Sequence, residues 1–314
     1  MTLTELRYIV AVARERHFGR AAEACFVSQP TLSVAIKKLE EELDVKLFER
    51  GANEVSVTPL GEEIVRQAQS VIEQAASIKE IAKRGKNPLS GPLRMGVIYT
   101  IGPYLLPPLV KQAIERMPQM PLVLQENFTV KLLEMLRTGE LDCAILAEPF
   151  PDTGLAVAAL YDEPFMVAVP SMHPLAKRRN IPAEELKKET MLLLGTGHCF
   201  RDHVLEVCPE YARFSSDAEG IRKSFEGSSL ETIKYMVASG MGITVVPQLS
   251  VPDEPQQHVT YVPFAKPVPT RRVVLAWRRS FTRYEAIAAL RNAIYNSPLK
   301  GVTWLTAMKS DVAA

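Results

Sequence analysis

A helix-breaking segment at residues 85–92 divides this chain more sharply than any other feature. The segment contains two glycines and two prolines, which do not continue a helix. Before it the chain has helical patterning and one short β-prone stretch, and after it short apolar segments alternate with amphipathic helices. We therefore predict a helical N-terminal part, a hinge at residues 87–92 and a larger α/β part.

A single long helix leads up to this hinge. Thr58 is a good N-cap, and Pro59 suits the first helical position because the N–H that proline lacks has no partner there. Apolar residues then recur at heptad spacing, at Leu60, Ile64, Ala68, Val71, Ala75, Ile78 and Ala82. One helix alone leaves this heptad seam exposed, so we predict that the linker helix, residues 59–86, forms a homodimer. The alternative is a long helix that packs on its own domain.

Residues 18–43 have the pattern of a helix-turn-helix. Ala21 and Ala22 are small enough to let two helices approach each other closely, and a short turn follows. Ser28 or the Gln29-Pro30 pair then opens a second helix, because a serine caps a helix and a proline tolerates its first turn. This pattern predicts a DNA-binding unit.

The second helix has one apolar face and one polar face. Its apolar residues share one side of a helical wheel and should point into the core: Leu32, Ile36, Leu39 and Leu43. Side chains near the start of a recognition helix reach base edges, whereas cations suit phosphates. We predict DNA contacts by Ser28, Gln29, Pro30, Thr31, Ser33, Val34, Lys37, Lys38 and Arg50, with Gln29, Thr31, Ser33 and Val34 on bases and the three cations on phosphates. The alternative is a face that is merely solvated.

The region after the hinge has alternating strands and helices. The clearest strands cover residues 93–98, 141–146, 165–169, 243–246 and 273–277. This order is typical of an α/β domain, and we expect a mostly parallel sheet.

Composition and length exclude several classes of protein. With 314 residues, 47% of them hydrophobic and 23% charged, the chain is an ordinary globular protein of two or three domains. It has no apolar run of 18 residues and no signal-peptide pattern, so we expect a cytoplasmic protein without membrane contact. Its 37 basic and 36 acidic residues nearly cancel, so net charge does not bear on DNA binding.

Two of the four cysteines, Cys199 and Cys208, lie close together, and three interpretations compete. Gly197 and His198 before Cys199 offer backbone N–H groups and a basic neighbour, and a helix N-terminus there would lower the thiol pKa further; the thiolate is the form that attacks peroxide. A metal site of His198, Cys199, His203 and Cys208 has suitable residue types without paired-ligand spacing. Cys208 could instead be a buried small hydrophobe, the interpretation that we adopt for Cys25 and Cys143.

The spacing of this pair has a mechanical consequence. If residues 200–207 are helical, Cys199 and Cys208 are separated by about 13 Å of rise and about 180° of rotation. A disulfide tolerates at most about 7 Å between Cα atoms. Oxidation to a disulfide would therefore unwind the helix and produce a large local rearrangement.

The N-terminal residues resemble the winged helix-turn-helix of LysR-type transcription regulators. The matching segments are Ala21-Ala22, Ser28-Gln29-Pro30-Thr31-Leu32-Ser33, Ile36-Lys37-Lys38-Leu39-Glu40, Leu47-Phe48-Glu49-Arg50 and Thr58-Pro59-Leu60-Gly61. The remaining α/β part resembles the periplasmic-binding-protein-like effector domain of the family. The resemblance implies a DNA-binding domain at 1–58, the linker helix, the hinge, and an effector domain at 93–314 with subdomain I at about 93–161 and 267–298 and subdomain II at about 162–266.

Within that family the cysteine region is similar to that of the hydrogen-peroxide sensors. The matching residues are 197–203, Cys208 and Ser229-Leu230-Glu231-Thr232. This similarity implies that Cys199 is oxidised by peroxide to a sulfenic acid and that Cys208 resolves it as a disulfide. It also implies that peroxide binding or thiolate tuning involves Thr100, Thr129, His198, Asp202 and Arg278, with Arg278 placing positive charge near the thiolate.

The resemblance also implies a set of partners and excludes others. The expected partners are double-stranded operator DNA, hydrogen peroxide, RNA polymerase, a thiol-disulfide reductant and further copies of the chain in a homotetramer. We expect no cofactor and no metal. Three other functions stay open at this stage: a regulator that binds a small organic effector between the subdomains, a thiol peroxidase that turns over peroxide, and a periplasmic-type solute binder.

Overall fold

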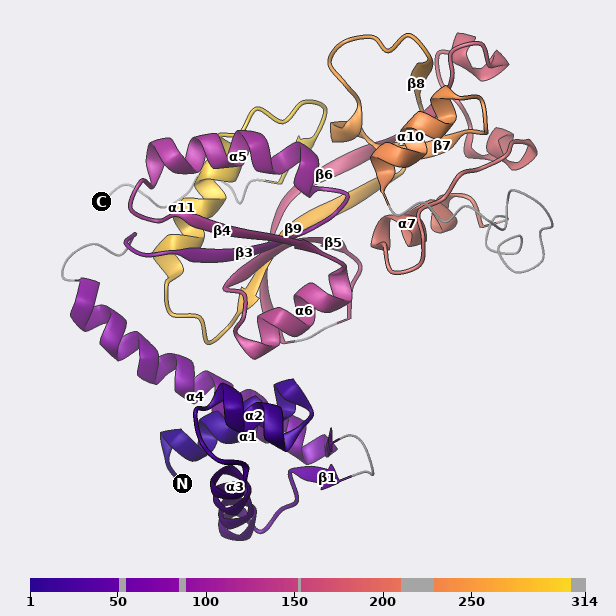
Figure 1. Cartoon of the computed structure of the whole chain (residues 1–314). Coiled ribbons are helices and arrows are strands. Elements are labelled where there is room, and N and C mark those ends of the chain that lie inside the picture. The colour runs from indigo at the N-terminus through magenta and orange to yellow at the C-terminus, as the bar shows by residue number, and fades with distance from the viewer. Residues whose placement is uncertain (51–54, 85–88, 152–153, 210–228, 306–314) are drawn as a thin grey trace.

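Three helices and a two-stranded hairpin form the N-terminal unit of the computed structural model, which describes residues 1–50, 55–84, 89–151, 154–209 and 229–305 (Figure 1). Helix α1 (Leu3–Glu15) contacts α2 (Phe18–Ala24) and α3 (Gln29–Leu43). Strands β1 (Phe48–Arg50) and β2 (Val55–Val57) pair antiparallel as the wing. The predicted helix-turn-helix is confirmed.

Local capping explains where the helices of this unit begin. The Ser28 side chain accepts a hydrogen bond from the backbone N–H of Thr31 at 3.3 Å, so Ser28 is the N-cap that the sequence predicted. Leu32, Ile36 and Leu39 are buried in the N-terminal core, as expected, whereas Leu43 is only partly buried at its edge. The apolar face of α3 therefore fixes which side chains the helix presents outward.

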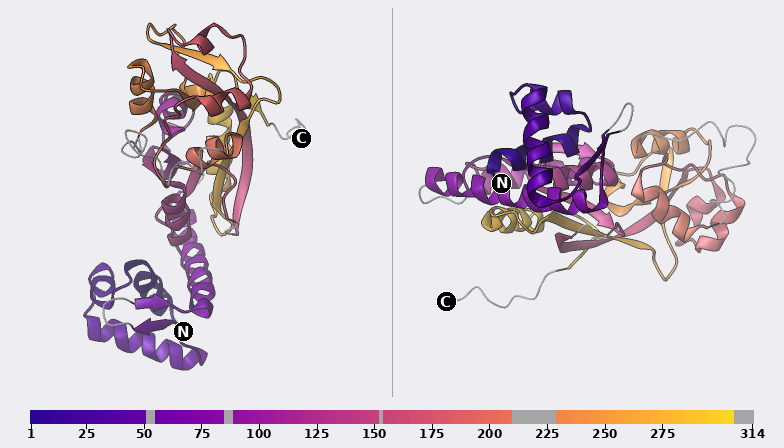
Figure 2. Two further views of the ribbon diagram at one scale, coloured as in Figure 1. Left: turned by 90° about the vertical axis from the view of Figure 1, so that its right-hand side faces the viewer. Right: turned by 90° about the horizontal axis from the view of Figure 1, so that it is seen from below.

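The long helix α4 (Pro59–Arg84) connects this unit to the rest of the chain (Figures 1 and 2). Thr58 caps it, since its hydroxyl accepts a hydrogen bond from Gly61 N–H at 2.9 Å. Within the heptad seam, Ala68 is buried in the N-terminal core, but Leu60, Val71 and Ile78 are 50%, 37% and 70% exposed. The chain itself thus covers only part of the seam. The side chain of Ala82, the last two residues of the predicted linker helix (85 and 86) and the first two of the predicted hinge (87 and 88) lie outside the described residues.

The effector region contains one continuous sheet with helices on its faces. Its strands are β3 (Leu93–Ile98), β4 (Leu122–Asn127), β5 (Cys143–Glu148), β6 (Leu155–Pro170), β7 (Thr244–Pro247), β8 (Val259–Pro263), β9 (Thr270–Arg278) and β10 (Thr303–Trp304). The order is β10-β6-β9-β5-β3-β4, and β7 and β8 also pair with β6. The α-helices are α5 (Gly102–Arg116), α6 (Thr129–Thr138), α7 (Cys199–Val207), α10 (Leu230–Ala238) and α11 (Tyr284–Tyr295), and the short 3-10 helices are η1 (Pro174–Lys177), η2 (Ala183–Lys188) and η3 (Gln248–Ser250).

The expectation of a mostly parallel sheet is wrong. In the described part of the sheet, β3 pairs in parallel with β4 and β5, and every other pairing is antiparallel. The reason is the path of the chain between two lobes of the effector region: the first lobe contains β3, β5, α5, α6 and α11, and the second contains β7, β8, α7 and α10. Strand β6 carries the chain out and β9 carries it back beside β6, so these two long strands must run in opposite directions (Figure 1).

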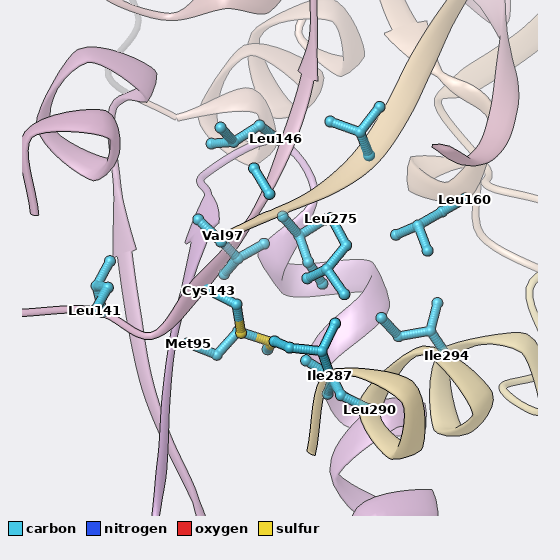
Figure 3. Close-up of a cluster of buried hydrophobic side chains, with 14 of the residues drawn as sticks. Met95, Val97, Leu141, Cys143, Leu146, Leu160, Leu275, Ile287, Leu290 and Ile294 are labelled. Atoms are coloured by element: carbon cyan, nitrogen blue, oxygen red, sulfur yellow. The ribbon is translucent and has the colours of Figure 1, made fainter. Parts of the chain in front are cut away.

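Each lobe has its own hydrophobic core. The first-lobe core includes β3, β5, α5, α6 and α11, and Figure 3 shows Cys143 within it among apolar side chains. The second-lobe core includes the distal half of β6 together with β7, β8, α7 and α10. Strand β6 runs from the first-lobe core into the second, and the start of β9 pairs with it at Pro164, so residues at this point can contact groups from either core.

Candidate functional site

Helix α7 carries the two cysteines of interest at its two ends. Cys199 is its first residue and Cys208 directly follows its last residue. Cys208 is buried in the second-lobe core, whereas Cys199 is partly buried and packs against the first-lobe core. All four cysteines lie within the described residues and are in the thiol form. The predicted helix is confirmed, and its length means that a Cys199–Cys208 bond requires α7 to unwind.

The turn before Cys199 depends on a glycine. Gly197 has φ +96°, a left-handed conformation that side chains disfavour, and a Cβ there would lie 3.4 Å from the Phe128 ring. His198 follows with an extended backbone and serves as the N-cap residue of α7. The turn therefore places the Cys199 thiol at a helix N-terminus and directs α7 into the second lobe.

The surroundings of the Cys199 thiol differ from the sequence expectation. Burial raises its pKa, and this is the largest effect; the Thr129 hydroxyl and the Arg271 guanidinium lower it, and the Asp202 carboxylate raises it. The predicted lowered pKa is therefore wrong for the reduced state. The local sequence showed a helix N-terminus, but the burial comes from packing against the first-lobe core, which is distant in sequence.

Arg271 is the cation whose charge lowers the pKa of the Cys199 thiol. It lies on β9, is fully buried, and its Nε donates to the Glu163 carboxylate at 2.9 Å. Its other nitrogens donate to the Thr100 hydroxyl at 2.7 Å and to the Thr100 carbonyl oxygen at 2.9 Å. The guanidinium also lies 5.2 Å from the centre of the Phe200 ring, the residue after Cys199. Arg271 thus connects both long strands, the end of β3 and the start of α7.

Arg278 does not have the position that the sequence analysis gave it. It lies at the other end of β9, seven residues or about 23 Å of strand from Arg271. Its Nε is 2.6 Å from the Glu73 carboxylate of α4, and Nη1 donates to the carbonyl oxygens of Leu136 and Leu141. Arg278 therefore holds the linker helix to the first lobe, and Arg271 is the arginine beside the thiol.

The other residues predicted to bind peroxide or to tune the thiol pKa differ in their burial. Thr129 is buried, and apart from the thiol its hydroxyl has no hydrogen-bond partner within the described residues. Thr100 is buried, and its hydroxyl accepts a hydrogen bond from Arg271. His198 is buried against the Phe128 ring, with ring centres 4.8 Å apart, and Asp202 is exposed. Of these residues, Thr129 acts on the thiol pKa through a hydrogen bond and Asp202 acts on it through its charge.

Sequence reasoning missed both Arg271 and Glu163. Strand alternation could have found Arg271, because it shares the inward face of β9 with the buried residues Val273 and Leu275, whereas Arg272 points outward. The same alternation applies to Glu163, which shares the buried face of β6 with Tyr161 and Phe165, whereas Asp162 is only partly buried.

Other candidate groups have structural positions. Cys143 is fully buried in the first-lobe core, and burial raises its pKa well above the usual range. Cys25 is partly buried at the end of α2, and burial raises its pKa as well. Among the described residues, no three His, Cys, Asp or Glu side chains are grouped to hold a metal ion. None of the described helices is long and apolar enough to cross a bilayer.

The outward face of α3 carries the predicted DNA-contacting side chains. Seven of the residues are exposed, namely Ser28, Gln29, Pro30, Thr31, Val34, Lys37 and Lys38, and Ser33 is partly exposed. Ser28 is also occupied as the helix cap, and Lys37 lies 3.6 Å from Glu41 in an exposed ion pair. The backbone of Arg50 lies in β1, and its side chain is outside the described residues.

Two family models match this architecture. Residues 3–62 match the bacterial regulatory helix-turn-helix protein of the lysR family, and residues 86–297 match the LysR substrate binding domain. This chain belongs to the LysR family. The fold is therefore the predicted one, an N-terminal LysR helix-turn-helix followed by a periplasmic-binding-protein-like α/β domain. Because LysR proteins are transcription regulators and not enzymes, the thiol-peroxidase hypothesis is excluded.

The LysR-family proteins that are similar to this chain in sequence include regulators that respond to hydrogen peroxide. The chain is 41% identical over 292 residues to the DNA-binding transcriptional dual regulator OxyR of Escherichia coli, covering 92% of this chain and 94% of the relative. Full-length OxyR from Pseudomonas aeruginosa, a cysteine mutant, superposes with a TM-score of 0.77 at 51% identity over 95% of this chain and 96% of that one. A peroxide-bound OxyR mutant from Corynebacterium glutamicum gives a TM-score of 0.63 at 34% identity over 94% of this chain and 92% of that one. The chain is thus an OxyR homologue.

Proposed function

We propose that this OxyR homologue is a DNA-binding activator of oxidative-stress genes that hydrogen peroxide switches through Cys199 and Cys208. The observation that carries the proposal is the placement of these cysteines at opposite ends of α7, one against each lobe core. A bond between them forces a change in the packing of both lobes, which is what a regulator needs from a small oxidant.

The proposed chemistry takes two steps. The Cys199 sulfur, as thiolate, attacks one peroxide oxygen; the O–O bond breaks, Cys199 becomes a sulfenic acid, and the released hydroxide takes up the thiol proton and leaves as water. The Cys208 sulfur then attacks the Cys199 sulfur, the S–O bond breaks, and a second water leaves. Two thiols are oxidised and one peroxide is reduced to two waters.

Residues around Cys199 assist the first step. The Thr129 hydroxyl and the Arg271 guanidinium both lower the thiol pKa and so favour the attacking thiolate against the effect of burial. We propose that Thr129 also binds peroxide, since its hydroxyl lacks another partner in the described part of the chain. Thr100, His198 and Asp202 form the surroundings of this group, with Thr100 orienting Arg271.

The proposal extends to DNA, oligomer and partners. The outward face of α3, its N-cap Ser28 and Arg50 of β1 would bind operator DNA through the nine residues predicted from the sequence. The exposed part of the heptad seam would pair two α4 helices, and two such dimers would form a homotetramer. Within the cytoplasm the protein would act with RNA polymerase, and a thiol-disulfide reductant would reset it. We propose the domain division 1–58, 59–86, 87–92 and 93–314, with the subdomain bounds given in the sequence analysis.

Mass spectrometry of thiols after one equivalent of hydrogen peroxide tests the proposal. The wild type should form a Cys199–Cys208 disulfide, Cys208→Ser should accumulate sulfenic acid at Cys199, and the control Cys143→Ser should behave as wild type. Operator footprints should change in the wild type and in Cys143→Ser only. Unreacted thiols with an unchanged footprint would contradict the proposal.

A further inference from the structure

His203 connects α7 to the first lobe at the middle of the helix. It lies between the two cysteines in sequence and is 5% exposed. Its Nε2 is 2.7 Å from the backbone carbonyl oxygen of Glu148, at the end of β5. A carbonyl oxygen accepts, so Nε2 carries the hydrogen and donates it. The bond therefore joins the segment that must unwind to a strand of the other lobe.

The second ring nitrogen of His203 has a different environment. Nδ1 is buried and has no hydrogen-bond partner among the residues that the structure describes. The imidazole also packs beside the Phe165 and Phe200 rings, with ring centres 6.2 and 6.4 Å away, and these two rings contact each other at 5.1 Å. The site thus accommodates the neutral ring with hydrogen on Nε2 and offers nothing to accept a second hydrogen.

We infer that His203 is a positioning residue: it holds α7 against β5 in the reduced state, and its protonation favours release of the helix and hence the Cys199–Cys208 disulfide. The inference rests on the proposed function, because it concerns the same switch. Unwinding α7 removes His203 from its site, so the ring becomes free to bind a proton that the docked helix excludes.

The charges around His203 support the direction of this effect. Burial lowers the pKa of its imidazole most; the bond to Glu148 raises it, the Arg271 guanidinium lowers it, and Glu206 and Asp202 raise it. Arg271 comes from β9 with its partner Glu163 from β6, and Asp202 and Glu206 belong to α7 itself. On balance the docked ring has a lowered pKa, whereas a released ring has the ordinary value of about 6.5.

The sign of the pH effect follows from these two pKa values. The docked state has its full stability above about pH 6.5 and loses it as pH falls toward the lowered pKa of the docked ring. Forming the disulfide releases two thiol protons, so its equilibrium with the dithiol shifts hundredfold per pH unit, or about 59 mV. Below about pH 6.5 the released His203 takes up one proton, which leaves a tenfold shift per pH unit, or about 30 mV.

The test is a redox titration of the full-length protein in a dithiol–disulfide buffer between about pH 5.5 and pH 7.5. The disulfide fraction is read by alkylation and mass spectrometry, and the midpoint is converted to a potential with the known potential of the buffer couple at each pH, because that couple exchanges two protons of its own. The midpoint potential of the wild type, plotted against pH, should change slope near about pH 6.5, and that of His203→Gln should keep the steeper slope throughout, because glutamine can donate to the Glu148 oxygen without titrating. His173→Gln is the matched control in the same lobe and should retain the break, since His173 pairs with Glu189 away from α7.

Each outcome separates the inference from the proposed function. His203→Phe keeps the ring packing and removes the hydrogen bond, so the disulfide should be favoured about tenfold at every pH. A wild-type slope equal to that of His203→Gln would overturn the inference while the disulfide itself remained established. If no Cys199–Cys208 disulfide forms at any pH, the proposed function fails and the inference fails with it.

Discussion

Substitution of Glu163 by Gln tests the electrostatic arrangement at the centre of the effector region. Glu163 and Arg271 form an ion pair at 2.8 Å in which both side chains are completely buried. Glu163 also accepts from the backbone N–H of Leu249 at 2.9 Å. Glutamine keeps the shape and an acceptor oxygen, but it leaves the Arg271 charge without a compensating charge in a region that excludes water.

The magnitude follows from that burial. Breaking a buried ion pair by removing one partner costs about 3–5 kcal/mol, because the other charge stays desolvated. The neighbouring pair, Arg272 with Asp162 at 2.9 Å, joins the same two strands but is 48% and 26% exposed. Arg272→Met should therefore cost about 1 kcal/mol or less. The two substitutions differ in burial far more than in pair geometry.

Urea unfolding followed by tryptophan fluorescence measures the difference. The two tryptophans of the chain, Trp277 and Trp304, both pack against the first-lobe core and report its unfolding. Glu163→Gln and Arg271→Met should each lower the free energy of unfolding by about 3–5 kcal/mol, and the double variant by less than their sum because no unpaired charge remains. Equal costs for the buried and the exposed pair would refute the reasoning.

Three further outcomes are expected from single substitutions. Thr129→Val removes the hydroxyl that lowers the Cys199 thiol pKa, so that pKa should rise and peroxide oxidation near neutral pH should slow about five- to tenfold, measured by sulfenic-acid trapping; an unchanged rate would exclude this role. Arg278→Met removes the partner of Glu73, so operator footprints should no longer respond to oxidation while the rate of thiol oxidation stays at the wild-type value; a slowed thiol reaction would contradict the placement of Arg278. Lys38→Ala should weaken operator binding to all sequences alike and reduce the salt slope of log K by about 1, read from binding isotherms at several salt concentrations.

Local sequence patterns predicted the parts of the fold that depend on neighbours in the chain. Ser28 and Thr58 act as helix caps, and the strand at 93–98 and the helix after Cys199 are where the patterns indicated. The direction of the sheet was not accessible in this way, because β9 reaches its place beside β6 from more than a hundred residues later. Pairing between distant strands depends on the path of the whole chain.

The candidate site shows the same limit. Thr129 and Asp202 do lie near the thiol, but Arg278 was chosen where Arg271 was needed, since two arginines on one strand look alike without knowledge of which end meets the other lobe. The pKa of Cys199 was predicted in the wrong direction for a related reason. A helix N-terminus is visible in the sequence, whereas burial by a core assembled from distant segments is not.

Because Cys143 is completely buried, the rate at which its thiol is alkylated reports local opening of the first lobe. Its thiol lies on β5 inside the first-lobe core with no exposed surface. An alkylating reagent reaches it only during moments when that lobe loosens, so its labelling rate in native buffer counts those moments. Comparing that rate before and after oxidation would show whether a Cys199–Cys208 disulfide changes how often the first-lobe core opens around Cys143.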